Sequence, residues 1–197
     1  MSTKYTRRAS SRLMGYDYST NGIYYITICA VNRQCIFGKI DNNMPVGAGL
    51  APARRKGRPQ GSPLHAPAHN IAPVCIELTE IGQIIDTHWR NIPNQYKNIE
   101  IDGYIIMPNH IHGILIKRAT ARVAPTSSLG QIIGSFKSKC AIDCLKYIRK
   151  NNLNKSAKIW QRSFYDHIIR DERSLHKIRK YIINNPLTWQ FDIEHRR

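Results

Sequence analysis

The order in which strand-like and helix-like segments follow one another is the feature that most limits how this chain can fold. Residues 22–31 are rich in β-branched and aromatic side chains, which predicts a first strand. In residues 77–92, apolar side chains recur at helical spacing, which predicts a helix. Residues 99–108 and 110–118 then predict two strands joined by a short turn.

The second half of the chain adds two helices and a strand. Residues 127–150 have the pattern of an amphipathic helix, and residues 158–172 contain a short strand or extended segment. A last helix is expected from about Glu172 to Asn185, where Pro186 stops it. The whole order predicts an α+β domain with a mainly antiparallel, ferredoxin-like (RRM-like) sheet and helices packed on it.

The length of 197 residues predicts a single domain, residues 1–197. Residues 45–73 are dense in Pro, Gly and Ala and cannot bury enough apolar surface to offset the entropy of ordering them. We therefore interpret this segment as a flexible insertion at the surface. Its basic cluster, residues 54–58, is typical of a solvated charge run, with contact to nucleic acid as the alternative.

The charge balance points to a polyanionic partner. The chain has 30 Lys and Arg residues against 13 Asp and Glu residues, a formal net charge of +17. Basic residues spread over a fold bind phosphate chains by releasing counterions, although a protein that is only nonspecifically basic is the alternative. The sequence contains neither G-x-x-x-x-G-K-[ST] nor G-x-G-x-x-G, so we expect no nucleotide cofactor.

Composition also limits the expected location of the protein. No apolar run reaches the length of a membrane-spanning helix, and the basic beginning of the chain lacks the apolar part of a secretory signal. The five cysteines are odd in number and form no C-x-x-C pair, which is typical of reduced thiols. Cys140 and Cys144, four apart on a predicted helix, make a poor metal site by themselves. We expect a cytoplasmic protein without a membrane partner.

The stretch MPNHIHGIL, residues 107–115, places two histidines in an apolar strand. Because alternate residues of a strand share a face, His110 and His112 project together, while Ile111 and Leu115 project to the opposite side. Two adjacent imidazoles form a natural half of a divalent-metal site. The alternative is a pair of hydrogen-bonded structural histidines.

The residues after the histidines exclude three common uses of H-x-H. A metallohydrolase of the H-x-H-x-D type requires Asp at position 114, and a histidine-triad hydrolase requires His there. A cupin requires Glu a few residues later. The sequence has Ile114 instead, followed by Leu115, Ile116 and Lys117.

A partner for the histidines is found in the last predicted helix. Tyr181 and Asn185 are four apart and therefore share a helical face. The Asn185 side-chain oxygen could complete a His-His-Asn metal site, and the Tyr181 hydroxyl could attack a bound phosphate. Since a free tyrosine has a pKa near ~10, such an attack needs a metal or a cationic neighbour. The alternative for Tyr181 is a packing aromatic.

Five segments occur together in a characteristic order: GYDYSTNGIYYITICAVNRQCIFG, MPNHIHGIL, SLGQIIGSFKS, IWQRSFYDHIIRDE and YIINNP. In this combination the chain resembles the REP-associated tyrosine transposases, relatives of the single-tyrosine transposases of single-strand insertion sequences within the HUH nuclease superfamily. The resemblance runs from about residue 7 to residue 190, and residues 45–73 stand outside it. It implies a fold of the HUH endonuclease type.

The resemblance also implies a mechanism. His110 and His112 would be the metal ligands, Tyr181 the nucleophile and Asn185 the third ligand, where many insertion-sequence relatives carry Gln. Members of the family use Mg or Mn to cut single-stranded DNA beside a hairpin, and they form a 5′-phosphotyrosine while freeing a 3′-OH. Because this exchange conserves the phosphodiester energy, strand transfer needs no nucleotide, in agreement with the missing phosphate-binding motifs.

Other candidate residues surround this core. Tyr165 lies near His167 and is a competing nucleophile, although the resemblance favours Tyr181. His167 and Arg170 are candidates for lining the site or contacting DNA, and a structural hydrogen bond is the alternative for His167. Trp189 could stack on an unpaired base, whereas core packing is expected for Trp160. Further candidates for DNA contact are Arg7, Arg8, Arg12, Lys137 and Lys139.

The leading hypothesis is therefore a metal-dependent transposase that cuts and joins single-stranded hairpin DNA. The main alternative is a hairpin-binding protein that no longer cuts, and a weaker one is an RNA-binding protein. The sequence leaves open whether the protein is a monomer or a homodimer. It also leaves open whether Tyr181 acts beside its own histidines or beside those of a partner.

Overall fold

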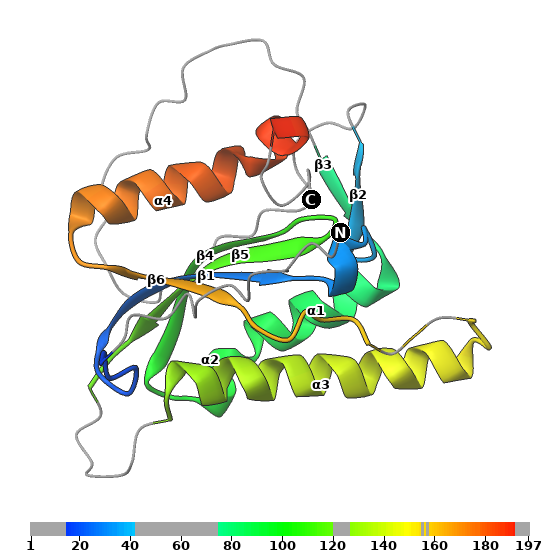
Figure 1. Cartoon of the computed structure of the whole chain (residues 1–197), viewed down its shortest axis with the longest axis horizontal. Coiled ribbons are helices and arrows are strands. Elements are labelled where there is room, and N and C mark those ends of the chain that lie inside the picture. The colour runs from blue at the N-terminus through cyan, green and yellow to red at the C-terminus, as the bar shows by residue number, and fades with distance from the viewer. Residues whose placement is uncertain (1–14, 42–74, 120–126, 155, 157, 192–197) are drawn as a thin grey trace, which may run out of the picture.

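The computed structural model describes residues 15–41, 75–119, 127–154, 156 and 158–191 (Figure 1). Its main sheet has four antiparallel strands in the spatial order β4–β5–β1–β6. These strands are β1 (Gly22–Cys29), β4 (Ile99–Ile106), β5 (His110–Lys117) and β6 (Tyr165–Ile169). With one helix after the first strand and one after the third, this is the ferredoxin-like arrangement, so the predicted fold class is confirmed.

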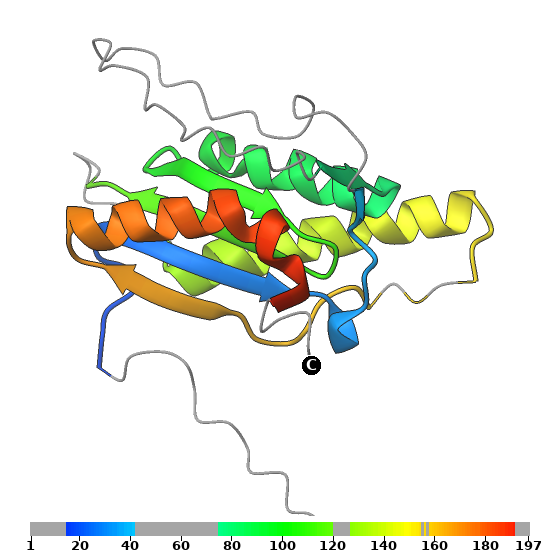
Figure 2. The ribbon, with the colours of Figure 1, turned by 90° about the horizontal axis from the view of Figure 1, so that it is seen from above.

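The helices cover both faces of the sheet. Helix α1 (Glu80–Arg90), the short α2 (Ile92–Gln95) and the long α3 (Leu129–Lys150) lie on one face (Figure 1). Helix α4 (Glu172–Asn184) lies alone on the other face and runs along the strands when seen from above (Figure 2). A 3-10 helix, η2 (Asn185–Phe191), follows α4, so the chain remains helical through Pro186 in a tighter form instead of stopping there.

The helices begin where the sequence provides side-chain caps. The Thr79 hydroxyl accepts a hydrogen bond from the Gly82 backbone N–H at the start of α1. Ser128 and Gln131 form a capping box at the start of α3, and the Asp171 carboxylate accepts from the Ser174 N–H at the start of α4. These caps satisfy backbone donors that would otherwise lack a helical partner.

The sheet separates two apolar cores. The larger core lies against α1 and α3 and contains Tyr24, Trp89 and Phe136. Trp160 belongs to it and donates its indole N–H to the Lys137 carbonyl, so the expected core role is confirmed. The smaller core lies under α4 and includes Met107, Ile114, Leu175 and Ile182. The sheet face under α4 is the one that can carry polar functional groups, because its apolar cluster is small.

A second, two-stranded sheet was not predicted. It pairs β2 (Gly38–Asp41) with β3 (Cys75–Leu78), after a 3-10 turn, η1 (Val31–Arg33). Each strand has 4 residues, which is too short for a clear alternation, and the partners are far apart in the sequence. The expected insertion, residues 45–73, lies between these strands and outside the described residues.

The described cysteines agree with the prediction of reduced thiols. Cys29, Cys140 and Cys144 are buried and unlinked, and Cys35 is exposed. Burial raises the pKa of the Cys140 thiol and raises that of Cys144 to about 11. Because metals bind the thiolate form, these two cysteines are packing residues in this structure.

Candidate active site

The two histidines lie on the face of the sheet that α4 covers. His110 and His112 are 0% and 2% exposed, and both project from β5 toward the helix. Ile111 and Leu115 point into the larger core on the other side of the sheet, as the strand alternation predicts. The apolar side chains therefore hold the strand in place, and the polar ones are available for chemistry.

The two imidazole rings turn the same atom toward each other. The Nε2 atoms of His110 and His112 are 2.9 Å apart. The Nδ1 atom of His110 lies 2.7 Å from the Asn109 side-chain oxygen. Since an amide oxygen only accepts, Nδ1 of His110 is the donor, and its Nε2 carries the lone pair. The neighbour immediately before the histidine thus sets which tautomer it adopts.

His112 is oriented from the neighbouring strand. Its Nδ1 lies 2.7 Å from the Tyr25 hydroxyl and 2.9 Å from the Thr27 hydroxyl. Thr27 is directly opposite His112 in the pairing of β1 with β5, and Tyr25 lies two residues earlier on the same face. Either hydroxyl can accept a hydrogen bond from Nδ1–H, in the tautomer whose Nε2 lone pair faces His110.

This arrangement fits a divalent cation. Two lone pairs 2.9 Å apart repel each other unless a proton or a cation lies between them. Two ligand atoms at about 2.1 Å from an octahedral cation, at a right angle, are about 3.0 Å apart. Among the described residues, no group of three or more His, Cys, Asp or Glu could hold a metal.

Tyr181 is brought to the histidine pair by α4. Its hydroxyl lies 3.4 Å from Nε2 of His112, and the two ring centroids are 5.2 Å apart. The helix packs its apolar side, which includes Leu175 and Ile182, on the smaller core. Tyr181 is 44% exposed, so its hydroxyl can meet a bound strand from solvent. The hydroxyl and the imidazole belong to the same chain.

Asn185 lies in the same region. It follows α4 directly and is 1% exposed. Tyr181, four residues earlier, contacts His112, and Trp189, four residues later, stacks on His110 with ring centroids 5.9 Å apart. Asn185 is therefore bracketed along the chain by residues that contact both histidines. Its role as the third ligand stays a prediction.

Strand β6 borders the site at the edge of the sheet. Tyr165 and His167 are exposed and separated by the buried Asp166, as expected for a strand. The Tyr165 ring lies 6.4 Å from that of Tyr25, and His167 is paired with Tyr25 across the strands. Arg170 is exposed just after the strand. The predicted contacts of His167 and Arg170 with DNA stay predictions.

Two further DNA-contact candidates lie away from the histidines, and their contact with DNA stays a prediction. Lys137 and Lys139 lie on α3, which covers the opposite face of the sheet (Figure 1). Lys137 donates to backbone carbonyls at Gln161 and Arg162, and burial lowers its pKa. Lys139 donates to the Gln95 side chain. Arg7, Arg8 and Arg12 lie outside the described residues.

Sequence reasoning missed three residues within hydrogen-bond distance of the histidines: Tyr25, Thr27 and Asn109. Trp189 was a candidate for base stacking, but its contact with His110 was not predicted. Asn109 directly precedes the first histidine, and this adjacency is a readable signal. Tyr25 and Thr27 reach His112 only through the register of β1 on β5, which the sequence does not specify.

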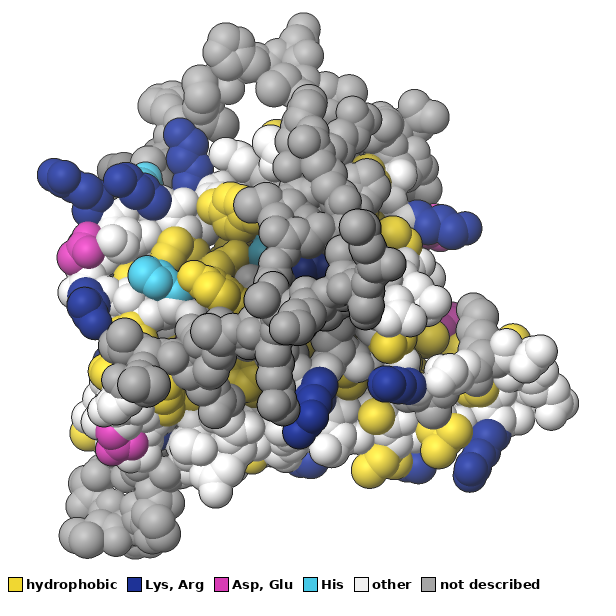
Figure 3. Space-filling model, viewed as in Figure 1, with side chains coloured by type: hydrophobic (Ala, Val, Ile, Leu, Met, Phe, Trp, Pro, Cys, Tyr) yellow, Lys and Arg dark blue, Asp and Glu magenta, His cyan; other side chains and the backbone are white. Residues whose placement is uncertain are grey.

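Sequence reasoning also missed the exposed basic residues of α4. The helix that carries Tyr181 exposes three of them, Arg173, Lys177 and Lys180. Figure 3 shows Lys and Arg side chains gathered at the left of the view, where α4 begins in Figure 1.

Comparisons with known proteins agree with this fold. A solved REP-associated tyrosine transposase bound to a REP hairpin has 14% sequence identity to this chain and a TM-score of 0.50. The similarity covers 92% of this chain and 75% of the other one. The fold is thus that of a tyrosine transposase.

The family follows from the sequence matches. The model of the family "Transposase IS200 like" matches residues 78–185, which include both histidines, Tyr181 and Asn185. An uncharacterised protein of Haemophilus influenzae is 32% identical over 208 residues, covering 98% of this chain and 97% of that protein. The chain belongs to the IS200-like transposase family, as its motifs predict. No helix in the described part of the chain is long and apolar enough to cross a membrane.

Proposed function

We propose that this transposase-family protein is a metal-dependent endonuclease and strand transferase for single-stranded, hairpin-forming DNA. The observation that carries the proposal is the position of the Tyr181 hydroxyl, 3.4 Å from Nε2 of His112, beside two imidazoles whose Nε2 atoms converge. A nucleophile next to a cation site is the arrangement that phosphoryl transfer to a side chain requires.

The metal would be held by Nε2 of His110 and His112, with Asn185 as the third ligand. Asn109, Tyr25 and Thr27 fix the two rings through their Nδ1 atoms, so the ligand atoms are oriented before a cation binds. A bound Mg²⁺ or Mn²⁺ would polarise the scissile phosphate and offset its charge. Nitrogen ligands favour Mn²⁺ over Mg²⁺.

The reaction would proceed in two exchanges at phosphorus. The Tyr181 oxygen attacks the scissile phosphorus and loses its proton to water, while the bond to the 3′ oxygen breaks and that oxygen takes up a proton. The products are a 5′-phosphotyrosine and a free 3′-OH. A second 3′-OH then attacks the phosphotyrosine, which restores the phosphodiester and the tyrosine. No nucleotide is consumed, because each step makes one phosphate ester and breaks another.

The strand would approach over the exposed side of α4. Tyr181 is reachable from solvent, and the basic residues of this helix, with Arg170 before it, can neutralise phosphates on either side of the cut. The solved relative in fold is bound to a REP hairpin, and we propose the same class of DNA for this chain. Since one chain holds both the histidines and Tyr181, we propose that a single protomer forms the site.

A covalent-capture experiment tests the proposal. The protein is incubated with a labelled REP-type hairpin oligonucleotide and Mn²⁺, and the adduct is detected on a denaturing gel. Wild type should form the adduct, EDTA should prevent it, and Tyr181→Phe should form none. Tyr165→Phe is the matched control, because it removes an exposed hydroxyl at the edge of the site, and it should form the adduct normally.

Two results would contradict the proposal. An adduct in Tyr181→Phe that disappears in Tyr165→Phe would move the nucleophile to β6. Tight hairpin binding without any cleavage by wild type in Mn²⁺, Mg²⁺ and other divalent metals would instead identify a DNA-binding protein that has lost the reaction.

A further inference from the structure

Helix α4 is attached to the sheet by an ion pair that the proposed chemistry does not use. The Arg179 Nε and Nη2 atoms donate to the two carboxylate oxygens of Asp102, over 2.6 and 2.8 Å. The Asp102 side chain is 11% exposed and the Arg179 side chain is 39% exposed, so the carboxylate is shielded from water while the arginine is partly open to it. A bidentate pair fixes orientation as well as distance, because the guanidinium and the carboxylate are both planar forks.

Asp102 lies on the α4 side of the sheet, beside a bulge in β4. Ile101 pairs with Leu115 and Tyr104 pairs with Gly113, so β4 uses one residue more than β5 over this stretch. Both Ile101 and Tyr104 pack on the larger core, and Ile105 packs on the smaller core under α4. Because Ile101 faces the larger core, strand alternation places Asp102 on the opposite side, where it accepts from Arg179. The extra residue then returns Tyr104 to the larger core.

The apolar stripe of α4 sets which side of the helix faces the sheet, and a directional contact is needed to fix the rotation more finely. Leu175, Ile178 and Ile182 pack on the smaller core, and hydrophobic burial is non-directional. Arg179 and Tyr181 are two residues apart, which is about 200° around a helix. They therefore project to different sides, Arg179 toward β4 and Tyr181 toward β5 and β1. Because the helix is rigid, a contact that fixes the direction of Arg179 also fixes the direction of Tyr181.

We propose that the Arg179–Asp102 ion pair is a clamp that fixes the rotation of α4 on the sheet and so holds Tyr181 beside His112. Arg179 and Asp102 are then positioning residues that touch neither the metal nor the scissile phosphate. The consequence for the rate of cleavage rests on the proposed function. The consequence for the geometry does not, because the Tyr181–His112 contact exists in the protein without DNA.

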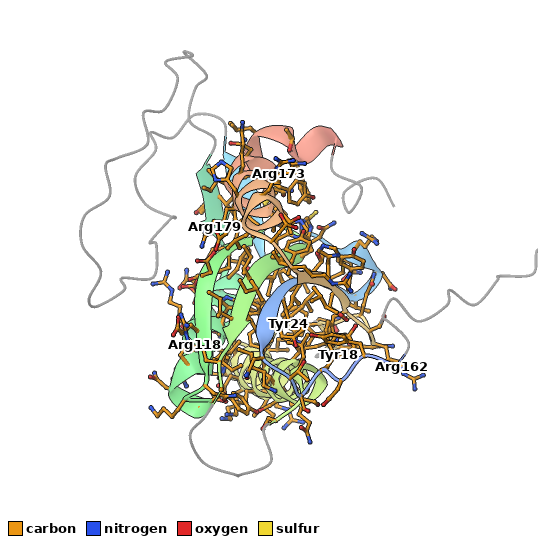
Figure 4. All side chains as sticks on the ribbon, turned by 90° about the vertical axis from the view of Figure 1, so that its left-hand side faces the viewer. Tyr18, Tyr24, Arg118, Arg162, Arg173 and Arg179 are labelled. Atoms are coloured by element: carbon orange, nitrogen blue, oxygen red, sulfur yellow. The ribbon has the colours of Figure 1, made fainter. Side chains whose placement is uncertain are left out.

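The chain provides a matched control on the same strand. Arg118 donates to both carboxylate oxygens of Glu100, over 2.5 and 3.1 Å, and Glu100 also belongs to β4. This pair has the same chemistry as the clamp, but it joins β4 to the end of β5 and does not involve α4. Figure 4 shows Arg179 beside α4 and Arg118 far from it along the same edge of the sheet.

The first measurement reports the position of the Tyr181 ring relative to His112 in the absence of DNA and metal. In protein with 13C-labelled histidine, the chemical shift of the Cε1–H group of His112 depends on the nearby Tyr181 ring. The Tyr181→Ala variant gives the reference shift of His112 without that ring. We expect Asp102→Asn and Arg179→Gln to shift the resonance toward the Tyr181→Ala position. Glu100→Gln and Arg118→Gln should leave it unchanged. A wild-type resonance in both clamp variants overturns the proposal.

The second measurement separates positioning from binding. Under single-turnover conditions, Asp102→Asn should slow adduct formation by about 10-fold or more, because small displacements of a reacting group cost rate steeply. Hairpin affinity should change less than about twofold, since the basic groups that neutralise phosphates remain. The double variant Asp102→Asn/Arg179→Gln should be no slower than the slower single variant, as expected for residues that act as one unit.

The outcomes distinguish the clamp from the proposed function. If wild type forms no adduct with any metal, the proposed function fails, and the His112 resonance alone decides the clamp. If the resonance shifts but the adduct rate stays at the wild-type value, the pair does not position Tyr181 and the proposal is overturned. Equal slowing in Glu100→Gln, measured in variants whose unfolding temperature matches wild type, would also overturn it.

Discussion

At the scale of single residues, the candidate site is defined by what holds the second nitrogen of each histidine. Asn109 accepts from Nδ1 of His110, and the hydroxyls of Tyr25 and Thr27 lie beside Nδ1 of His112. These contacts hold the two rings so that their Nε2 atoms face each other. The role of the pair as metal ligands stays a prediction, which binding of Mn²⁺ tests.

This geometry predicts the effect of changing Asn109. Asn109→Ala removes the acceptor for Nδ1 of His110, and we expect Mn²⁺ affinity to fall about 10-fold or more. Asn109→Asp keeps an acceptor in place and should retain affinity. Isothermal titration with Mn²⁺ in the absence of DNA measures both. Asn154→Ala, an exposed change after α3, is the control. Unaltered affinity in Asn109→Ala would show that this contact does not orient the ring.

At the scale of elements, β5 works because its two faces meet different partners. Its α4 side carries the histidines, and its other side is pressed against α1. A Cβ atom added to Gly113 would lie 2.2 Å from the Trp89 ring, which is buried in the larger core. Gly113 is therefore needed for the close approach of α1 to the strand, directly beside His112.

The close approach predicts a loss of stability. Gly113→Ala forces Trp89 or the strand to move, and overpacking of this kind costs about 1–3 kcal/mol. We expect a lower midpoint in urea unfolding and, since the strand carries His112, weaker Mn²⁺ binding. Gly103→Ala on β4 is the matched control, because an added Cβ there meets no atom within 4 Å. Equal midpoints for the two variants would contradict this packing argument.

At the scale of the whole molecule, the small sheet ties the expected insertion to the domain. Asp41, at the end of β2, pairs with Cys75, at the start of β3. The ends of the intervening segment are therefore held together by strand pairing, and the segment leaves and re-enters the fold at one point. That the chain forms one domain with an insertion at residues 45–73 stays a prediction.

A deletion tests that organisation. Replacing residues 42–74 with an Asn-Gly turn should preserve the thermal unfolding temperature, because a two-residue turn can join paired antiparallel strands. Adduct formation should also be preserved if the basic cluster at 54–58 is only solvated. Comparing hairpin affinity over a range of salt concentrations with that of the full chain isolates the cluster. A deletion variant that fails to fold would show that the segment is part of the domain.

The fold was largely predictable from the sequence because its elements carry local signals. The β-branched and aromatic residues of 22–31 and the helical spacing of apolar residues in 77–92 are properties of neighbouring residues. The two short strands of the small sheet were not predictable, because their pairing depends on contacts between distant segments. The position of Lys137 and Lys139 shows the same difference, and their contact with DNA stays a prediction. Their helix was clear, but which face of the sheet it covers was not a local property.

The sequence by itself determined the residue types of the candidate site and their grouping. H-x-H in a strand puts two imidazoles on one face, and a spacing of four puts Tyr181 and Asn185 on one face of a helix. Only the tertiary structure decided that these two faces meet in one chain, through Tyr181 and His112. Strand register selected Tyr25 and Thr27 as partners of His112, and the packing of α4 on the sheet brought Arg179 to Asp102. The physical reason is that periodicity fixes the direction of a side chain within its element, whereas its partner depends on packing and register between elements.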